Sequence, residues 1–314
     1  MRIISLICVL GLLFSFSLTI EAENNSWNFT IDDPVGDDYG PGNYKYPEDE
    51  IFSSYQGLFD IKKFNIIETK NDYIFEFKFV KLTDPWNSKY GFSHPLIELY
   101  IDNKEKGSTE LIEDGANIRL DPASKWNKAL KLSGWWLLAY DWDQKLDDLI
   151  SIDGNFEDRK GEVKNSKVEK INNSIKVQFP KKIVGELQGA KIQLIVGSFD
   201  PFGPGYFRLI SDTPRSWNFY AEGVEKTSKA PRVIDAILPN NISQKEALAI
   251  KDQNGEYKQP QIKAIKIPEK KDDSIVQIFK STYFYIFIII LTALIILYSD
   301  KIKEFLLAQD KLKE

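Results

Sequence analysis

The sequence predicts an all-β fold, a β-sandwich, followed by one C-terminal transmembrane helix. Two observations predict the sandwich: apolar residues alternate with polar ones in many short runs, and turn-forming residues separate these runs. A third observation predicts the membrane helix, a stretch of nineteen residues without a charge between Lys280 and Asp300. Few helical segments lie between the expected strands, which argues against a doubly wound α/β fold.

The composition is that of a folded chain and excludes several classes of function. Of the 314 residues, 43% are hydrophobic, and the formal net charge of −5 leaves no basic excess for binding nucleic acid. The chain has one cysteine (Cys8), one histidine (His94) and one methionine (Met1). We therefore expect no structural zinc and no haem attached through a C-x-x-C-H motif. A Ser-His-Asp enzyme would have to be built on His94 alone.

The first element is a predicted signal peptide over residues 1–22. A charged Arg2 precedes an apolar run from Ile3 to Ile20, and the small residue Ala22 marks the expected cleavage site. The alternative is an anchor that is not cleaved.

The predicted β-sandwich occupies residues 23–235 and is expected to be the binding domain. In residues 73–80, three phenylalanines share one face of the strand while Glu76 and Lys78 share the other. The same alternation recurs in residues 97–101, 175–179 and 192–196. Turn chemistry separates the runs, for example at Asp84-Pro85, Asp102-Asn103 and Phe202-Gly203-Pro204-Gly205.

Three further elements are expected after the sandwich. Prolines and charges in residues 236–280 predict an extended stem, with a last strand or two on the domain, from residues 233–238, as the alternative. Residues 281–299 would form a transmembrane helix roughly 28 Å long, close to the thickness of the hydrocarbon core. A buried core helix is the alternative for this segment. We expect residues 300–314 to be a short cytoplasmic tail of a single-pass cell-membrane protein with its N-terminal domain outside.

Several stretches carry a resemblance to a known family, among them residues 57–64, 82–86, 91–93, 97–102 and 233–239, and two further segments carry it most specifically. Residues 33–47 have the sequence Asp-Pro-Val-Gly-Asp-Asp-Tyr-Gly-Pro-Gly-Asn-Tyr-Lys-Tyr-Pro, and residues 196–205 have the sequence Val-Gly-Ser-Phe-Asp-Pro-Phe-Gly-Pro-Gly. From about residue 31 to residue 248 the chain resembles the C-terminal module of glucodextranase, which is related to DOMON domains and to family 9 carbohydrate-binding modules. The resemblance implies a DOMON-like sandwich with immunoglobulin-like layers.

The resemblance implies a binding protein rather than an enzyme. In that family the module is usually appended to exported glycoside hydrolases that act on α-glucans, and it is thought to bind carbohydrate or the cell surface. We expect no catalytic domain beside it, and no spacing in the sequence identifies the two carboxylates of a glycoside hydrolase. We expect a membrane-anchored protein that binds polysaccharide or a cell-envelope component, beside a separately encoded hydrolase or transporter. The alternative is a surface structural protein that contacts an envelope or secreted protein through an aromatic patch.

Aromatic residues are the candidate ligands of a carbohydrate. A sugar ring stacks its C–H face on an indole, while its hydroxyl groups bind carboxylates, amides or arginine. Trp135 and Trp136 are adjacent, so on a strand one faces the core and the other does not. The alternative is that all the tryptophans, Trp217 included, are core or interface residues. The predicted carbohydrate-binding set is Trp86, Trp126, Trp135, Trp136, Asp141, Trp142, Asp143 and Tyr206.

An acidic loop near the N-terminus is the candidate calcium site. Four aspartates lie within the seven residues 32–38, together with Gly36. Calcium prefers several carboxylate and carbonyl oxygens on a turning backbone, although the spacing is not that of an EF-hand. The predicted ligands are Asp33, Asp37 and Asp38. The alternative is a solvated acidic turn.

Overall fold

The chain folds into two compact units, Met1–Pro268 and Glu269–Glu314. The predicted signal peptide, residues 1–22, lies outside the part of the chain that the structure describes. The computed structural model describes residues 27–143, 166–222, 224, 226–269, 285–293, 296, 298, 299, 301, 303, 304 and 308.

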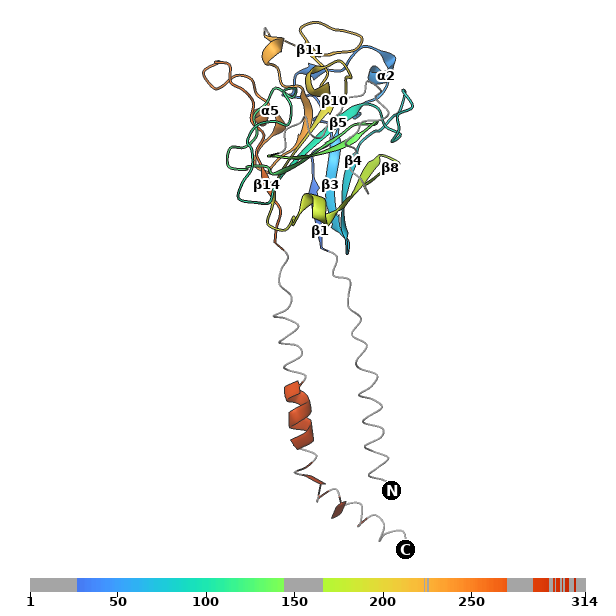
Figure 1. The fold of residues 1–314 in the computed structure, drawn as a ribbon, viewed down its shortest axis with the longest axis vertical. Coiled ribbons are helices and arrows are strands. Elements are labelled where there is room, and N and C mark those ends of the chain that lie inside the picture. The colour runs from blue at the N-terminus through green and yellow to red at the C-terminus, as the bar shows by residue number, and fades with distance from the viewer. Residues whose placement is uncertain are drawn as a thin grey trace. The chain divides into compact units, whose positions relative to one another are not determined.

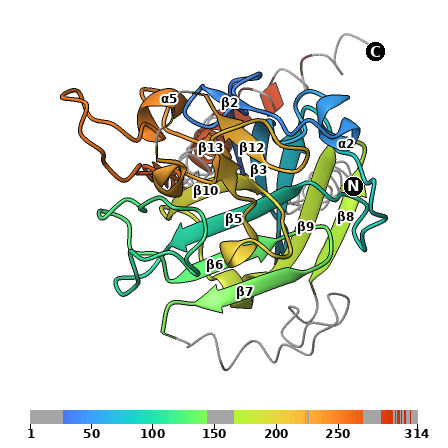
Figure 2. The same ribbon diagram turned by 90° about the horizontal axis from the view of Figure 1, so that it is seen from above.

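Two antiparallel sheets form most of the first unit (Figure 1). One sheet has the strand order β1-β3-β4-β9-β8, and the other has the order β13-β10-β5-β6-β7, with β14 also paired to β10. Figure 2 shows β10, β5, β6 and β7 following one another across the second sheet. A small third sheet has the order β11-β12-β2. A fold dominated by β-sheets confirms the all-β prediction.

The strands are short, as the spacing of the turn residues predicted. Their bounds are β1 Asn28–Asp32, β2 Tyr44–Lys45, β3 Ile61–Glu68, β4 Asp72–Phe79, β5 Pro95–Asp102, β6 Lys128–Leu132, β7 Leu137–Asp141, β8 Lys167–Ile171, β9 Ser174–Pro180, β10 Lys191–Ser198, β11 Ile210–Ser211, β12 Phe219–Ala221, β13 Val233–Ile237 and β14 Ile265–Lys266. The helices of this unit are single turns: α2 Glu50–Ser53, α4 Lys181–Val184, η1 Pro204–Tyr206, η2 Thr227–Lys229 and α5 Gln244–Ala247.

The main hydrophobic core lies between the two large sheets. Alternate residues of β4 point into it, so Phe75, Phe77 and Phe79 are at most 2% exposed. The alternating apolar residues of β5, β9 and β10 are buried in the same cluster. Period-two alternation therefore predicted the inward faces of these strands correctly, because neighbouring side chains on a strand point to opposite sides.

A second hydrophobic cluster covers the other face of the six-stranded sheet. The loops over residues 103–127 and 239–262 contribute Ile118, Trp126 and Ile262 to it, while β5 contributes Tyr100. For this reason β5 is buried on both faces, and even Glu98 is 0% exposed. The alternation in the sequence placed Glu98 and Tyr100 on one face of the strand but did not show that loops cover that face.

Most of the segment predicted as a stem packs on the first unit. Within residues 236–268, β14 pairs with β10, and Leu248 and Ile262 are 0% exposed. The first compact unit extends to Pro268, so the described residues 236–268 belong to it.

The second unit is described in part, and residues 285–293 of it are helical. Among the described residues, no helix has both the length and the apolar character needed to cross a membrane. Several residues of the predicted transmembrane segment 281–299, namely 281–284, 294, 295 and 297, lie outside the described residues.

Candidate functional site

Four loops at one end of the second sheet enclose a hollow of about 510 Å³. They connect β4 to β5, β6 to β7, β10 to β11 and β11 to β12. The antiparallel register brings the start of β5 beside the ends of β6 and β10, which is why these loops meet. Most of the residues that line the hollow are aromatic. These aromatic residues are Trp86, Trp135, Phe199, Phe202 and Trp217.

The aromatic rings form a continuous surface along the hollow. Trp217 stacks on Trp86 with ring centroids 6.2 Å apart, and Trp86 lies 6.5 Å from Trp135. Trp135 in turn stacks on Phe199 at 4.8 Å. Phe202 is 92% exposed and Trp217 is 46% exposed. Large aromatic side chains that gather in a hollow and remain open to solvent are typical of a binding site.

The tight turn between β6 and β7 contains the two adjacent tryptophans and directs their side chains to different surroundings. A β-carbon on Gly134 would collide with the carbonyl oxygen of Phe92, so this position requires glycine. The Ser133 hydroxyl accepts hydrogen bonds from the backbone amides of Trp135 and Trp136 at 3.2 and 3.3 Å. As a result Trp135 lines the hollow, while Trp136 is buried in the second cluster with 1% exposure.

Asp200, Arg208 and Asn218 supply the polar side chains of the lining. The side chain of Arg208 is 7% exposed, and its Nη1 lies 3.6 Å from Oδ2 of Asp200. Burial lowers the pKa of Arg208 and the Asp200 carboxylate opposes this effect, but arginine remains charged in proteins. The hollow thus combines apolar ring faces with a charged hydrogen-bonding group, as a sugar ring with its hydroxyl groups requires.

His94 lies behind the aromatic surface rather than in it. Its ring centroid is 5.0 Å from that of Trp86 and 4.9 Å from that of Phe52. Burial lowers the pKa of His94 to about 4, Arg208 adds to this effect, and Asp84 opposes it. The imidazole is therefore neutral near pH 7 and supports Trp86 as a packed ring.

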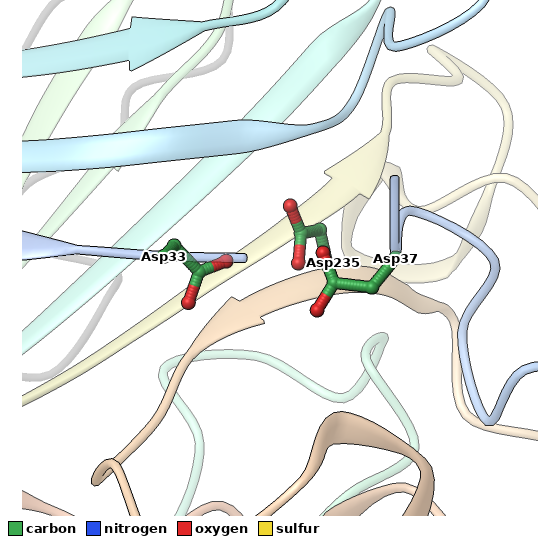
Figure 3. Close-up of side chains that lie close together, drawn as sticks. All are labelled: Asp33, Asp37 and Asp235. Atoms are coloured by element: carbon green, nitrogen blue, oxygen red, sulfur yellow. The ribbon is translucent and has the colours of Figure 1, made fainter. Parts of the chain in front are cut away.

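A second candidate site is a cluster of three carboxyl groups from distant parts of the chain (Figure 3). Asp33 follows β1, Asp37 lies in the next loop, and Asp235 belongs to β13. One carboxylate oxygen of each residue lies within 4.8 Å of the others. Asp235 is held by the backbone amides of Ile61 and Ala236, each 2.7 Å from one of its two oxygens. The arrangement offers hard oxygen ligands of the kind that calcium or magnesium prefers.

The cluster concentrates carboxyl groups at a partly buried position, where Asp33 and Asp37 are half-buried and Asp235 is buried. Burial raises the pKa of Asp33 to about 8, and the charges of Asp37 and Asp60 add to the effect. Burial likewise raises the pKa of Asp37 to about 6 and holds that of Asp235 well above its usual value. Among the described residues none donates a hydrogen bond to Asp33 Oδ2 or Asp37 Oδ1. A bound cation would neutralise this charge and use these free oxygens.

Asp38, the third predicted calcium ligand, is engaged elsewhere. Its Oδ2 accepts hydrogen bonds from the Tyr46 hydroxyl and from the backbone amide of Phe59, the latter at 3.4 Å. The three-carboxylate group contains Asp235 in its place. Asp235 lies about two hundred residues from the acidic loop, so no local motif joins it to Asp33 and Asp37.

A family model matches residues 29–261, which include both the aromatic hollow and the carboxylate cluster. It describes the C-terminal binding module, SLH-like, of glucodextranase. This chain belongs to that family. The resemblance that the two sequence segments indicated is thereby confirmed. A comparison with curated proteins found no match.

The structure divides the predicted carbohydrate-binding residues of the module into three groups. Trp86 and Trp135 line the hollow. Trp126, Trp136 and Tyr206 belong to or pack against the second hydrophobic cluster, and Trp126 Nε1 donates a 2.6 Å hydrogen bond to the Glu110 carbonyl. The remaining three residues, Asp141, Trp142 and Asp143, lie at the end of β7 and outside the hollow. Asp141 pairs with Lys128, and Trp142 is 39% exposed.

Seven lining residues of the module were absent from the predicted set, namely Phe199, Asp200, Pro201, Phe202, Arg208, Trp217 and Asn218. Phe199, Phe202 and Arg208 lie in or just after the segment that carries the family resemblance. Phe202 is an apolar residue among turn residues, Asp-Pro-Phe-Gly-Pro-Gly, where exposure is expected. The position of Phe202 among turn residues was the sequence signal that could have indicated an exposed aromatic side chain. No sequence pattern showed that Arg208 folds back toward Asp200.

Proposed function

We propose that this protein binds a carbohydrate, as a free polysaccharide or as part of the cell envelope, through the aromatic hollow and does not transform it. The observation that carries the proposal is the row of aromatic rings, with Phe202 and Trp217 open to solvent. Membership in a family of binding modules supports a binding role. Glycoside hydrolysis uses two carboxyl groups, and of the described residues that line the hollow Asp200 alone carries one, which supports a non-catalytic role.

Removing one ring from the hollow is expected to weaken glycan binding about tenfold. Trp217→Ala and Trp135→Ala each remove a stacking surface worth on the order of 1.4 kcal/mol, which corresponds to a factor of ten. The measurement is quenching of tryptophan fluorescence by soluble oligosaccharides, with the full-length protein purified in detergent micelles. A glycan array first identifies an oligosaccharide that binds.

Trp142→Ala is the matched control, because Trp142 is an exposed tryptophan outside the hollow. We expect its affinity to equal that of the unaltered protein. If Trp142→Ala loses binding while Trp217→Ala keeps it, the site is at the end of β7 and the assignment is wrong. Binding to purified envelope proteins with no binding to any glycan would favour the surface structural protein instead.

We further propose that calcium occupies the carboxylate cluster and stabilises the loop after β1. The support is the convergence of Asp33, Asp37 and Asp235 within 4.8 Å and the raised pKa of all three carboxyl groups. Calcium at about a hundredfold above its dissociation constant would add about 2.7 kcal/mol of stability. For a domain of this size the melting temperature would rise by about 5–10 °C.

The calcium prediction is tested by thermal unfolding in calcium and in a chelator. Asp235→Asn is expected to abolish the calcium-dependent rise, because it removes a charged ligand while keeping the shape of the side chain. Asp114→Asn, at an exposed aspartate outside the cluster, should preserve it. Equal melting temperatures with calcium and with chelator would rule the site out.

We also propose that the module is displayed outside the cell on a single membrane span. The apolar run in residues 1–22 supports export, and the uncharged stretch 281–299 supports the span. Alkaline extraction of membranes tests the anchor: the full chain should stay with the lipid, and a chain that stops at Pro268 should be released. Full-length chain recovered in the cytosol would overturn this topology.

A further inference from the structure

The polar edge of the aromatic hollow is held in place by the fold. Arg208 donates from Nε to the Ser198 hydroxyl at 3.0 Å and from Nη2 to the Phe199 carbonyl at 2.7 Å. The ring of Phe52 lies 5.2 Å from the guanidinium carbon. Two of the three guanidinium nitrogens are therefore engaged by the protein, and the position of the third, Nη1, is determined before any ligand binds.

Asp200 faces this third nitrogen without bonding to it. One oxygen of Asp200, Oδ1, accepts a 3.0 Å hydrogen bond from the backbone amide of Phe202. The other oxygen, Oδ2, lies 3.6 Å from Arg208 Nη1, which is beyond hydrogen-bond length. A donor and an acceptor thus lie next to each other at the edge of the hollow, each with hydrogen-bonding capacity left for a ligand.

A hydroxyl group fits this pair, and a charged group does not. A hydroxyl oxygen accepts from Nη1 while its hydrogen is donated to Oδ2, so both partners are satisfied by one atom. A carboxylate or sulfate has acceptors only and meets the negative charge of Asp200. An ammonium group has donors only and meets the positive charge of Arg208. We infer that the hollow is specific for an uncharged sugar, whose hydroxyl group bridges Arg208 Nη1 and Asp200 Oδ2.

This inference rests on the proposed carbohydrate-binding function and adds a prediction about charge. The full-length protein in detergent micelles is applied to an array of paired oligosaccharides of equal length. Within each set one glycan has glucose units, one has glucuronic acid units and one has glucosamine units. We expect at least a tenfold preference for the neutral glycan over both charged ones.

Asp200→Asn tests the role of the carboxylate directly. The substitution removes the negative charge and leaves Arg208 unneutralised, so affinity for the glucuronic acid glycan should rise about tenfold, and affinity for the neutral glycan should fall. Asp212→Asn is the matched control, because Asp212 is exposed and outside the hollow yet the net charge changes equally. The control should keep the preference of the unaltered protein.

The outcomes separate this inference from the proposed function. If the unaltered protein binds acidic or cationic glycans as well as neutral ones, or if Asp200→Asn leaves the preference unchanged, the charge argument is wrong while carbohydrate binding stands. If no glycan binds, or if Trp217→Ala has no effect on those that do, carbohydrate binding through the hollow itself fails. Should Asp200→Asn not fold, the preference of the unaltered protein decides the matter alone.

Discussion

Replacing Lys131 by methionine is expected to destabilise the protein by about 3–5 kcal/mol. The Lys131 side chain is 0% exposed, and its Nζ lies 2.9 Å from Glu98 Oε1 and 2.7 Å from Glu113 Oε2. Burial alone would lower the pKa of Lys131, but the two carboxylates raise it above its usual value. Without the ammonium group, Glu98 would remain buried beneath the covering loops with its charge uncompensated.

The measurement is equilibrium unfolding in urea, with an exposed ion pair as the control. Lys167→Met removes a similar lysine whose side chain is 64% exposed and whose partner Glu169 is 46% exposed, so the loss should stay below about 1 kcal/mol. The double variant Lys131→Met/Glu98→Gln should recover part of the stability, because it removes the unpaired charge as well. If both lysine variants lose the same small amount, the buried pair does not stabilise the fold as described.

The same substitution should disturb the aromatic hollow. The Lys131 ammonium lies 5.6 Å from the ring centroid of Tyr206, and Tyr206 stacks on Phe199 with the ring planes 12° apart. The buried ion pair on the sheet thus supports the loop that carries Phe199 and Phe202. We expect weaker glycan binding in Lys131→Met even under conditions where the variant remains folded.

Acidification is expected to weaken the fold through His94, by about 2 kcal/mol between pH 7 and pH 4.5. The pKa of His94 is lowered in the folded state from its usual 6.5 to about 4, chiefly by burial and then by Arg208. The unfolded chain therefore binds a proton more readily than the folded protein does. The stability that His94 contributes is present above pH 6.5 and is lost as the pH falls from 6.5 toward 4.

A comparison of two proteins isolates this effect from other titrating groups. The carboxylate cluster has raised pKa values and so changes stability in the opposite direction as the pH falls, but it does so equally in any His94 variant. His94→Phe keeps an aromatic ring against Phe52 and Trp86 and removes the titration. Urea unfolding at pH 7 and at pH 4.5 should show the unaltered protein losing about 2 kcal/mol more than the variant. Equal pH dependence in the two proteins would contradict the assignment.

Much of the strand pattern could be predicted from the sequence because it depends on neighbouring residues. The phenylalanines of β4 were assigned to one face by their spacing alone, and they are buried together. The outer face of β5 could not be assigned in this way. Glu98 and Tyr100 have the spacing of a solvent-facing pair, yet the loops over residues 103–127 and 239–262 cover them and Lys131 compensates the charge.

The candidate site was predictable to a smaller extent. The sequence predicted Trp86 and Trp135 as binding aromatics, and both line the hollow. It could not separate them from Trp126, because an indole that packs in a core and an indole that binds a sugar have the same local sequence properties. Trp126 contacts Tyr100 at a ring distance of 5.7 Å and donates its Nε1 hydrogen to the Glu110 carbonyl, which a single sequence does not show.

By itself the sequence determined the β class, the inward faces of the strands, the family and the acidic loop, since composition, alternation and short motifs are local properties of the chain. Only the tertiary structure decided which loops meet. The order of strands in the sheet brings Asp235 to Asp33 and Asp37, and it gathers Trp86, Trp135 and Trp217 around one hollow. Strand order depends on the summed packing of two sheets, so contacts between distant residues are settled by the whole fold rather than by any one segment.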